Sequence, residues 1–168
     1  MHIRRLTTSD ASAYRALRLR AFRDHPEAFT SSHAEEAIKP LSIAEQRLSA
    51  SSSCRVWGAF VDKLLVGMVG LERERRQKVW HKGTVIGMYV APEYARRGIA
   101  RALLNQVLEH ALEIGLELLV LTVTRGNEAA ENLYRDLGFQ SWGIEPGAIK
   151  ILDRRLDKNH LFLQLRPS

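Results

Sequence analysis

Residues 87–112 read GMYVAPEYARRGIARALLNQVLEHAL, and this stretch decides the fold. An apolar run passes through a proline and two arginines to Gly98, where a helical pattern begins. A helix N-terminus has unsatisfied backbone N–H groups and a partial positive charge, so it suits an anion. Glycine lacks the Cβ that would hold a ligand away from that backbone. The stretch therefore predicts a phosphate group bound at the start of the helix.

The helix that Gly98 opens carries an apolar stripe, which consists of Ile99, Leu103, Val107, Leu108, Ala111 and Leu112. Such a stripe packs on a sheet and holds the first turn at the end of a strand, where α/β folds bind ligands. Main-chain amides at 97–101 can then cradle a diphosphate, and Arg96 or Arg97 can add charge-assisted hydrogen bonds. The alternative interpretation is that Gly98 is an ordinary loop glycine and that Arg96 and Arg97 are simply exposed to solvent. The sequence contains no GxGxxG motif and no ordered P-loop signature.

The composition limits the classes of protein to consider. A chain of 168 residues, 45% hydrophobic and 26% charged, is long enough for one well-buried core and short for two, so we expect one domain. The 25 Lys and Arg residues against 19 Asp and Glu residues give a net charge of +6. This balance admits an anionic ligand, an anionic protein surface or a nucleic acid.

The cysteine count decides whether disulfides or a Cys-rich zinc site are possible, and the length of the apolar runs decides whether a segment could span a membrane. Cys54 is the only cysteine, which excludes an intrachain disulfide and a Cys-rich zinc site, and we expect no metal. The N-terminal segment MHIRRLTTSD turns polar at once and has no apolar signal region. Apolar runs such as LLVGMVGL are far shorter than the roughly 20 residues that span a bilayer. We therefore expect a soluble, cytoplasmic protein with no membrane partner.

The first half of the chain predicts antiparallel strands with helices between them. A short strand at 3–6 precedes a helix that breaks at Pro26, and an irregular segment then leads to a short helix near 42–49. The runs RVWGAFVD and LLVGMVGLERE are strand-like, and Asp62-Lys63 between them suits a tight hairpin. TVIGMYV, at 84–90, is a third strand.

The second half predicts alternating helices and strands. The helix at about 98–114 ends at Gly115, the buried strand LELLVLTV follows, and a helix at about 127–137 ends at Gly138. The last segments read as extended pieces separated by EPG and DKN. Antiparallel strands followed by a strand–helix–strand–helix–strand passage make a mixed α/β sheet.

The second helix carries polar groups that suit an amide-containing ligand. Asn127 and Tyr134 are two helical turns apart and share one face, and Asn127 can also cap the helix. The asparagine amide offers both a donor and an acceptor, and a tyrosine hydroxyl with a pKa of about 10 keeps its proton at neutral pH. Ala129 and Ala130 have small side chains, which leave space for a ligand beside the first turn. The alternative is a capping asparagine and a core tyrosine.

These residues resemble the GNAT superfamily of acetyl-CoA-dependent N-acyltransferases. YVAPEYARRGIARALL matches the family's pyrophosphate-loop segment, NEAAENLYRDLGF matches its second signature, and the order of strands and helices agrees over nearly the whole chain. The resemblance implies a single GNAT-like domain over 1–168 with a mixed α+β fold. Its sheet would be mixed but mostly antiparallel, with about six or seven strands, splayed central strands and about four flanking helices.

The resemblance also implies a binding site for acetyl-CoA as cosubstrate. The strand of Met88, Tyr89 and Val90 would pair through its backbone with the pantetheine amides. Asn127 would contact the pantetheine arm beside Ala130, and Tyr134 would approach the thioester sulfur. The pyrophosphate would lie on the loop of Arg96, Arg97, Gly98, Ile99, Ala100 and Arg101. Ala95 stands where the family often has Gln or Arg, which leaves open the side chain that supports this loop.

The implied reaction is direct transfer of the acetyl group to a primary amine of a small molecule, peptide or protein in a ternary complex. A lysine-like amine with a pKa near 10.4 must lose a proton before it attacks, so a base or a water path is needed. Tyr134 would assist the departing thiolate, and a backbone N–H near Met88 or Val90 would stabilise the oxyanion. Relatives often place a glutamate base where this chain has Thr84 or Thr122. Glu35, Glu36, Glu72 or Glu74 could act through water, and His81 is a further candidate; the alternative is that each is a surface residue, so no base is assigned.

The acceptor and the partners are less defined. The segment PEAFTSSHAEEA would shape the acceptor side of the cleft, where Glu35 and Glu36 suit a cationic amine or simply begin an acidic helix. A non-catalytic acyl-CoA sensor is the main alternative function. A basic nucleic-acid-binding module would use patches such as RERRQK, but no zinc finger, basic zipper or RNA signature is present, so we expect no nucleic-acid partner. A homodimer is kept as an alternative to a monomer.

Overall fold

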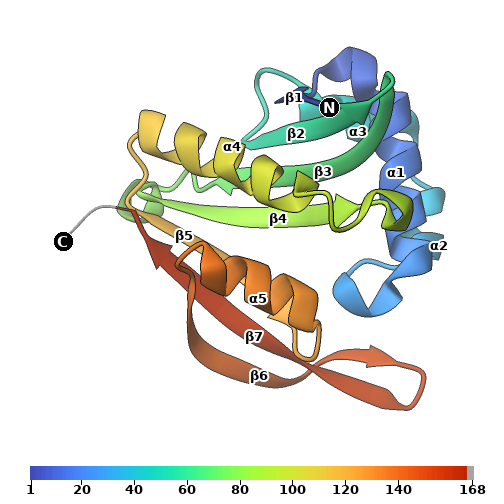
Figure 1. Cartoon of the computed structure of the whole chain (residues 1–168). Helices are drawn as coiled ribbons and strands as arrows, with labels where there is room; N and C mark the ends of the chain where they lie inside the picture. Colours follow the sequence, from blue (N-terminus) through green and yellow to red (C-terminus); the bar gives the residue numbers. More distant parts are fainter. Residues whose placement is uncertain (166–168) are drawn as a thin grey trace.

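The computed structural model describes residues 1–165, and within them seven strands form one sheet in the order β1-β2-β3-β4-β5-β7-β6 (Figure 1). In the described chain, β4 and β5 are the one parallel pair, and all other neighbours are antiparallel. The sheet is therefore mixed and mostly antiparallel, as the sequence predicts. The strands are β1 His2–Arg5, β2 Cys54–Val61, β3 Leu64–Arg73, β4 Lys82–Val90, β5 Leu118–Thr124, β6 Gln140–Ile151 and β7 Arg154–Gln164.

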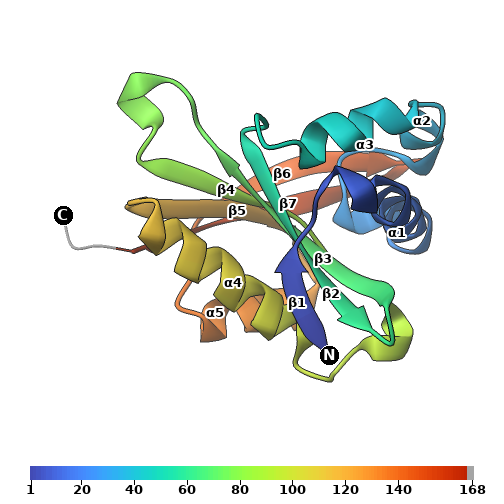
Figure 2. The same ribbon diagram turned by 90° about the horizontal axis from the view of Figure 1, so that it is seen from above.

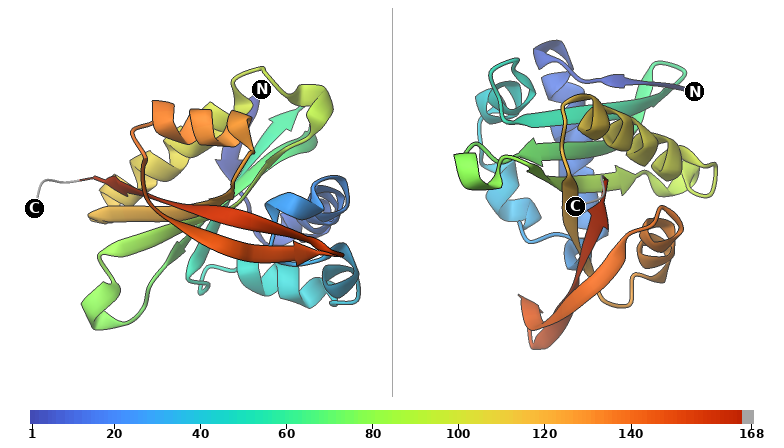
Figure 3. Two further views of the ribbon diagram at one scale, coloured as in Figure 1. Left: turned by 90° about the horizontal axis from the view of Figure 1, so that it is seen from below. Right: turned by 90° about the vertical axis from the view of Figure 1, so that its left-hand side faces the viewer.

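Helices cover both faces of the sheet (Figures 2 and 3). One face carries α1 Ala11–Asp24, α2 His33–Ala37 and α3 Leu41–Leu48, and the other carries α4 Ile99–Glu113 and α5 Glu128–Asp136. The described residues thus hold five α-helices rather than about four, because a capping box at Ser32 starts α2 inside the segment that we expected to be irregular. In this part of the chain, no helix is long and apolar enough to cross a membrane.

Two hydrophobic clusters hold these layers together. Most of the predicted stripe of α4 packs on one face of the sheet with Leu119, Leu121 and Val123 of β5, but Leu112 is exposed and Leu104, which was not predicted, is buried. On the other face, α1 and α3 pack on side chains such as Val56 and Met68. Because β3 lies between the two clusters, its residues are buried on both sides, which explains the continuous apolar run in its sequence.

The hairpin predicted at Asp62-Lys63 is confirmed, whereas the breaks expected at EPG and DKN are not. Asp62 and Lys63 both adopt positive φ angles, 48° and 68°, as the predicted two-residue hairpin requires. The expectation that EPG and DKN separate extended pieces is wrong, since β6 and β7 run through them and turn at 152–153. Pro146 is tolerated because β6 lies at the edge of the sheet and the register shifts between Glu145 and Ile149.

The centre of the sheet opens between its two parallel strands. Across the described residues, the β4–β5 ladder joins Lys82, Gly83 and Thr84 to Leu118, Leu119 and Val120, and goes no further. Beyond Thr84 the two strands separate, as expected for splayed central strands. The edge of β4 that would face β5 consequently keeps backbone groups free to bind another chain-like molecule.

Candidate active site

A cleft of about 650 Å³ lies where β4 and β5 separate. Its walls come from these two strands, from α1 and the segment that follows it, from α5, and from β6 and β7. Four residues of the predicted acetyl-CoA site line it: Met88, Asn127, Ala130 and Tyr134. The volume falls in the range of small-ligand pockets.

A β-bulge shapes the wall that β4 contributes. Tyr89 pairs with Met68 and Ile86 pairs with Gly70, so Gly87 and Met88 together oppose the single residue Val69. Gly87 adopts a φ of 61°, a conformation typical of a glycine in a bulge. The bulge places Gly87 and Met88 against the cleft.

The other two residues of the predicted strand segment direct their side chains elsewhere. Tyr89 is buried in the cluster under α1, and its hydroxyl donates to Asp24 over 3.5 Å. Val90 packs against the cluster under α4. If these residues take part in binding, they can do so only through their backbone, which is the contact that the sequence analysis assigned to them.

The loop before α4 has the geometry of an anion site. Gly98 precedes the helix with a φ of 76°, and no side chain caps this N-terminus. A Cβ built on Gly98 would meet nothing within 4 Å among the described atoms, so the space above the first turn is open. Ile99 is buried and anchors the loop in the core, whereas Ala100 is only partly covered. The first-turn N–H groups therefore face an accessible surface.

The three arginines of this loop have different surroundings. Arg97 stacks over the ring of Tyr94 at 5.2 Å, and Arg101 pairs with Asp136 at 3.0 Å. Arg96 is exposed, has a φ of 58°, and forms no ion pair within residues 1–165. Of the three loop arginines, Arg96 thus has neither an ion pair nor a ring contact in the described structure.

The first turn of α5 forms the next wall. The Oδ1 atom of Asn127 accepts the Ala130 N–H over 3.3 Å, so the asparagine caps the helix as expected while it also lines the cleft. Tyr134 lies two turns further on the same face. Its side chain is 6% exposed and its ring packs edge-on against Phe139. Burial raises the pKa of Tyr134 to about 12, which keeps its hydroxyl protonated.

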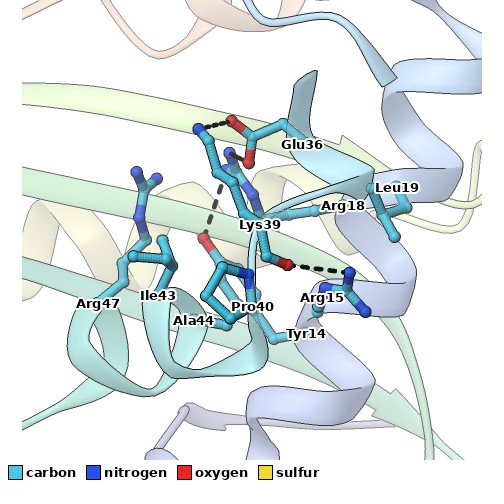
Figure 4. A pocket seen from close by; sticks show the side chains of 10 residues that line it. All are labelled: Tyr14, Arg15, Arg18, Leu19, Glu36, Lys39, Pro40, Ile43, Ala44 and Arg47. Carbon is cyan, nitrogen blue, oxygen red and sulfur yellow. Dashed lines mark hydrogen bonds and ion pairs between the residues drawn. The ribbon is translucent and has the colours of Figure 1, made fainter. Parts of the chain in front are cut away.

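The opposite wall is rich in cations that sequence patterns did not reveal. Arg18 of α1, Arg47 of α3 and Lys39 between α2 and α3 reach the same region (Figure 4). Lys82 and Lys158 also line the cleft. The sequence held one clue to Arg18. It lies four residues from both Tyr14 and Phe22, which are buried, so it shares the inward face of α1 with them.

Glu36 is the single carboxylate among the described residues that line the cleft. It binds Lys39 at 2.5 Å and Arg18 at 3.4 Å. Burial alone would raise the pKa of Glu36, but these two cations outweigh burial and hold that pKa below its usual value. Glu35 instead accepts the Ser32 N–H over 2.9 Å and caps α2. The pair does not form an acidic pocket for a cationic amine, and the alternative of an acidic helix start describes Glu35.

None of the other candidate bases lines the described cleft, and threonines stand where relatives often have a glutamate. Thr84 and Thr122 line the cleft, whereas Glu72, Glu74 and His81 are not among its described lining residues. His160, which the sequence analysis missed, lines it next to Trp142. Its Nε2 atom lies 2.8 Å from Glu145 Oε2, and its ring packs against Trp142 with centroids 5.3 Å apart. It faces the same way as Thr122, its partner in the β5–β7 ladder.

Residues 15–139 match the model of the acetyltransferase (GNAT) family, and the chain belongs to this family. The chain is 32% identical over 108 residues to human N-acetyltransferase 8, an alignment of 60% of this chain and 44% of the relative. It is 30% identical over 141 residues to the mycothiol acetyltransferase of Thermobispora bispora, covering 81% of this chain and 45% of that protein. The chain thus spans about half the length of these curated relatives.

A solved structure shares the fold over the whole chain. A putative acetyltransferase from Salmonella typhimurium, determined with its cofactor acetyl-CoA, superimposes with a TM-score of 0.84 and 21% sequence identity. The superposition covers 100% of this chain and 95% of the other. A likeness at 21% identity establishes the shared fold alone.

Proposed function

We propose that this chain, acting as one domain over 1–168, transfers the acetyl group of acetyl-CoA to a primary amine. The separation of β4 and β5 carries the proposal. It creates one cleft bounded by the β4 bulge, by Asn127 and by Tyr134, and β4 leads directly into the Gly98 loop. Membership of the acetyltransferase family and the fold shared with a cofactor-bound structure support it.

Acetyl-CoA would lie along the opening of the sheet. The pyrophosphate would accept hydrogen bonds from the free N–H groups at Gly98, Ile99, Ala100 and Arg101, with Arg96 adding charge. The pantetheine arm would pair with the unpaired edge of β4 at 88–90, in the manner of an added strand. The amide of Asn127 and the small side chain of Ala130 would flank that arm.

The chemical step would be direct. The neutral amine attacks the thioester carbonyl, and a backbone N–H of Met88 or Val90 stabilises the oxyanion. A C–N bond forms and the C–S bond breaks, while Tyr134 gives its proton to the departing thiolate. The one proton lost from the amine nitrogen passes through water or His160 back to the Tyr134 phenolate and restores the phenol. Because its pKa is raised, the Tyr134 phenol stays protonated at neutral pH and its hydrogen is in place to form a hydrogen bond to the departing sulfur.

The position of the only cysteine favours direct transfer over an acyl-enzyme. Cys54 is buried in the cluster under α1 and is not among the described residues that line the cleft. Burial raises the pKa of its thiol, so little thiolate is present to act as a nucleophile. A covalent acetyl-cysteine intermediate therefore has no support in this geometry.

Two measurements on the purified protein test the proposal. Acetyl-CoA should raise the melting temperature, because a ligand that binds the folded state stabilises it by mass action. Coenzyme A should then be released when a panel of amines is added, with initial-velocity lines that intersect as a ternary complex requires. Tight acetyl-CoA binding without turnover on any amine would indicate a sensor. Absence of binding would refute the cofactor site.

A further inference from the structure

The acceptor half of the cleft carries an excess of positive charge. Its described lining includes Arg18, Lys39, Arg47, Lys82 and Lys158, against the single carboxylate of Glu36. Glu36 is already engaged by Lys39 and Arg18. The charge that remains has to be balanced by solvent ions or by a ligand.

Arg47 is the clearest uncompensated cation. It is half-buried on α3, it lies near the hydroxyl of Tyr14, and it forms no ion pair with a carboxylate in the described part of the chain. Arg18 contacts the same hydroxyl at 3.4 Å. The two guanidinium groups, one on α1 and one on α3, thus lie near one neutral hydroxyl, and both line the pocket shown in Figure 4. A planar guanidinium suits a bidentate contact with a carboxylate or a phosphate.

The cations lie beside the centre of the proposed reaction. Arg18 Nη1 lies 3.7 Å from the position that a Cβ on Gly87 would take, so the guanidinium touches the β4 bulge. This bulge would hold the carbonyl that the amine attacks.

The phosphates of coenzyme A do not account for this charge. They would bind at the N-terminus of α4, which packs on the opposite face of the sheet from α1 and α3. The cations therefore serve a group that is not part of the cofactor.

Resting on the proposed function, we propose that the acceptor is a small amine that carries an anionic group, a carboxylate or a phosphate, close to its nitrogen, and that Arg47 and Arg18 bind this group. The anion restores the charge balance of the cleft. The surrounding cations also disfavour the ammonium form of the amine, which promotes the neutral form that attacks. A polycationic amine would be repelled.

Matched pairs of amines test the charge requirement. Rates of coenzyme A release are measured for L-methionine against L-methioninamide, for L-phenylalanine against its amide, and for phosphoethanolamine against ethanolamine. Within at least one pair the anionic member should have a kcat/KM about 10- to 100-fold higher, the range expected for hydrogen bonds to a charged group. The amino-acid and phosphate pairs distinguish a carboxylate from a phosphate.

Variants locate the anion. Arg47→Gln should reduce the preference for the anionic member about tenfold or more while changing kcat/KM for the neutral member less than about twofold. Arg47→Lys should restore part of the preference, because it keeps the charge and loses the planar fork. Arg76→Gln is the matched control, since this exposed arginine lies outside the cleft and should leave the preference unchanged. Circular dichroism melts establish that each variant is folded.

The outcomes separate this proposal from the one on which it rests. Turnover that is fastest with the neutral members or with spermidine overturns the anion requirement and leaves the acetyltransferase proposal standing. If no amine releases coenzyme A, calorimetric titration of inorganic phosphate and L-methionine into the CoA-saturated protein decides the question. Binding that Arg47→Gln weakens supports the anion site, and no binding by the unaltered protein refutes it.

Discussion

The ring of Tyr134 packs edge-on against the ring of Phe139, with centroids 5.8 Å apart and ring planes at 66°. Phe139 follows the turn after α5 and is itself buried, so the contact holds the tyrosine between the helix and the sheet. The tyrosine side chain reaches the cleft from this fixed position. A buried phenol held in place can deliver its proton to one defined point, the property required of a proton donor to the leaving thiolate.

Removal of this hydroxyl should slow the reaction without disturbing the fold. We expect Tyr134→Phe to lower kcat about a hundredfold or more, the range for loss of a general acid, because the packing on Phe139 is kept. The dissociation constant of acetyl-CoA, measured by calorimetry, should change less than about threefold. Tyr94→Phe, which alters a tyrosine outside the cleft, is the control. Equal kcat in Tyr134→Phe and the unaltered protein would remove the catalytic assignment.

The phosphate loop can be tested with two glycines of nearly equal geometry. Gly98 and Gly115 flank α4 with φ angles of 76° and 77°, and a Cβ on either meets nothing within 4 Å in the described structure. Each change to Ala should cost about 1–2 kcal/mol of stability, because an L-residue is strained in this region. Only Gly98→Ala should weaken acetyl-CoA binding, by about tenfold or more, since its methyl group blocks the helix N-terminus. Equal affinities in the two variants would place the diphosphate elsewhere.

A hydrogen bond joins two distant segments at the side of the cleft where we propose that the amine binds. Thr124 at the end of β5 is buried, and its hydroxyl donates to the carbonyl of Glu27 over 2.6 Å. Thr124→Val should destabilise the fold by about 1–3 kcal/mol, since the carbonyl loses its partner, and should raise KM for the amine more than for acetyl-CoA. Thr124→Ser keeps the hydroxyl and serves as the control. An unchanged ratio of the two KM values would show that this contact does not shape the acceptor site.

One ion pair makes stability depend on pH in a defined direction. Asp10 accepts two hydrogen bonds from Arg4, at 2.7 and 2.8 Å, and these lower the pKa of Asp10 from 3.8 to about 2. Because the folded pKa lies below the unfolded value, the stabilisation is present above pH 3.8 and is lost as the pH falls towards about 2.

Asp10→Asn should therefore reduce the free energy of unfolding at pH 7 by about 1–2 kcal/mol, a value discounted because Arg4 is 40% exposed. The difference from the unaltered protein, measured by urea unfolding, should shrink between pH 3.8 and about 2. Arg4→Gln should produce a similar loss at pH 7. A difference that stays constant down to pH 2 would mean that the ion pair is not its source.

Local signals in the sequence predict a large part of this molecule. The helix start at Gly98, Asn127 as a helix cap, and the hairpin at Asp62-Lys63 all occur where the sequence places them. Each depends on the backbone conformation of a few adjacent residues, which the residue types themselves largely control. The order of strands and helices follows from apolar periodicity in the same way.

Errors arose where a contact between distant segments overrides a local signal. EPG in β6 has the composition of a turn, but pairing with β7 keeps it in a bulged edge strand. From the sequence, Glu36 was a candidate for binding a cationic amine. In the structure it forms ion pairs with Arg18 and Lys39 instead. The sequence shows that these charged residues are present, but not which of them form ion pairs with one another.

The sequence by itself determined the family, the order of elements, the helix start at Gly98 and the shared face of Asn127 and Tyr134, because these depend on neighbours within a few residues. Only the tertiary structure decided that β4 and β5 part after Thr84, and that Arg18 lies against Gly87 in a cationic cleft that Arg47 also lines. The physical reason is that pairing between strands and the balance of charges in a cavity depend on how separate segments pack, which no local pattern specifies.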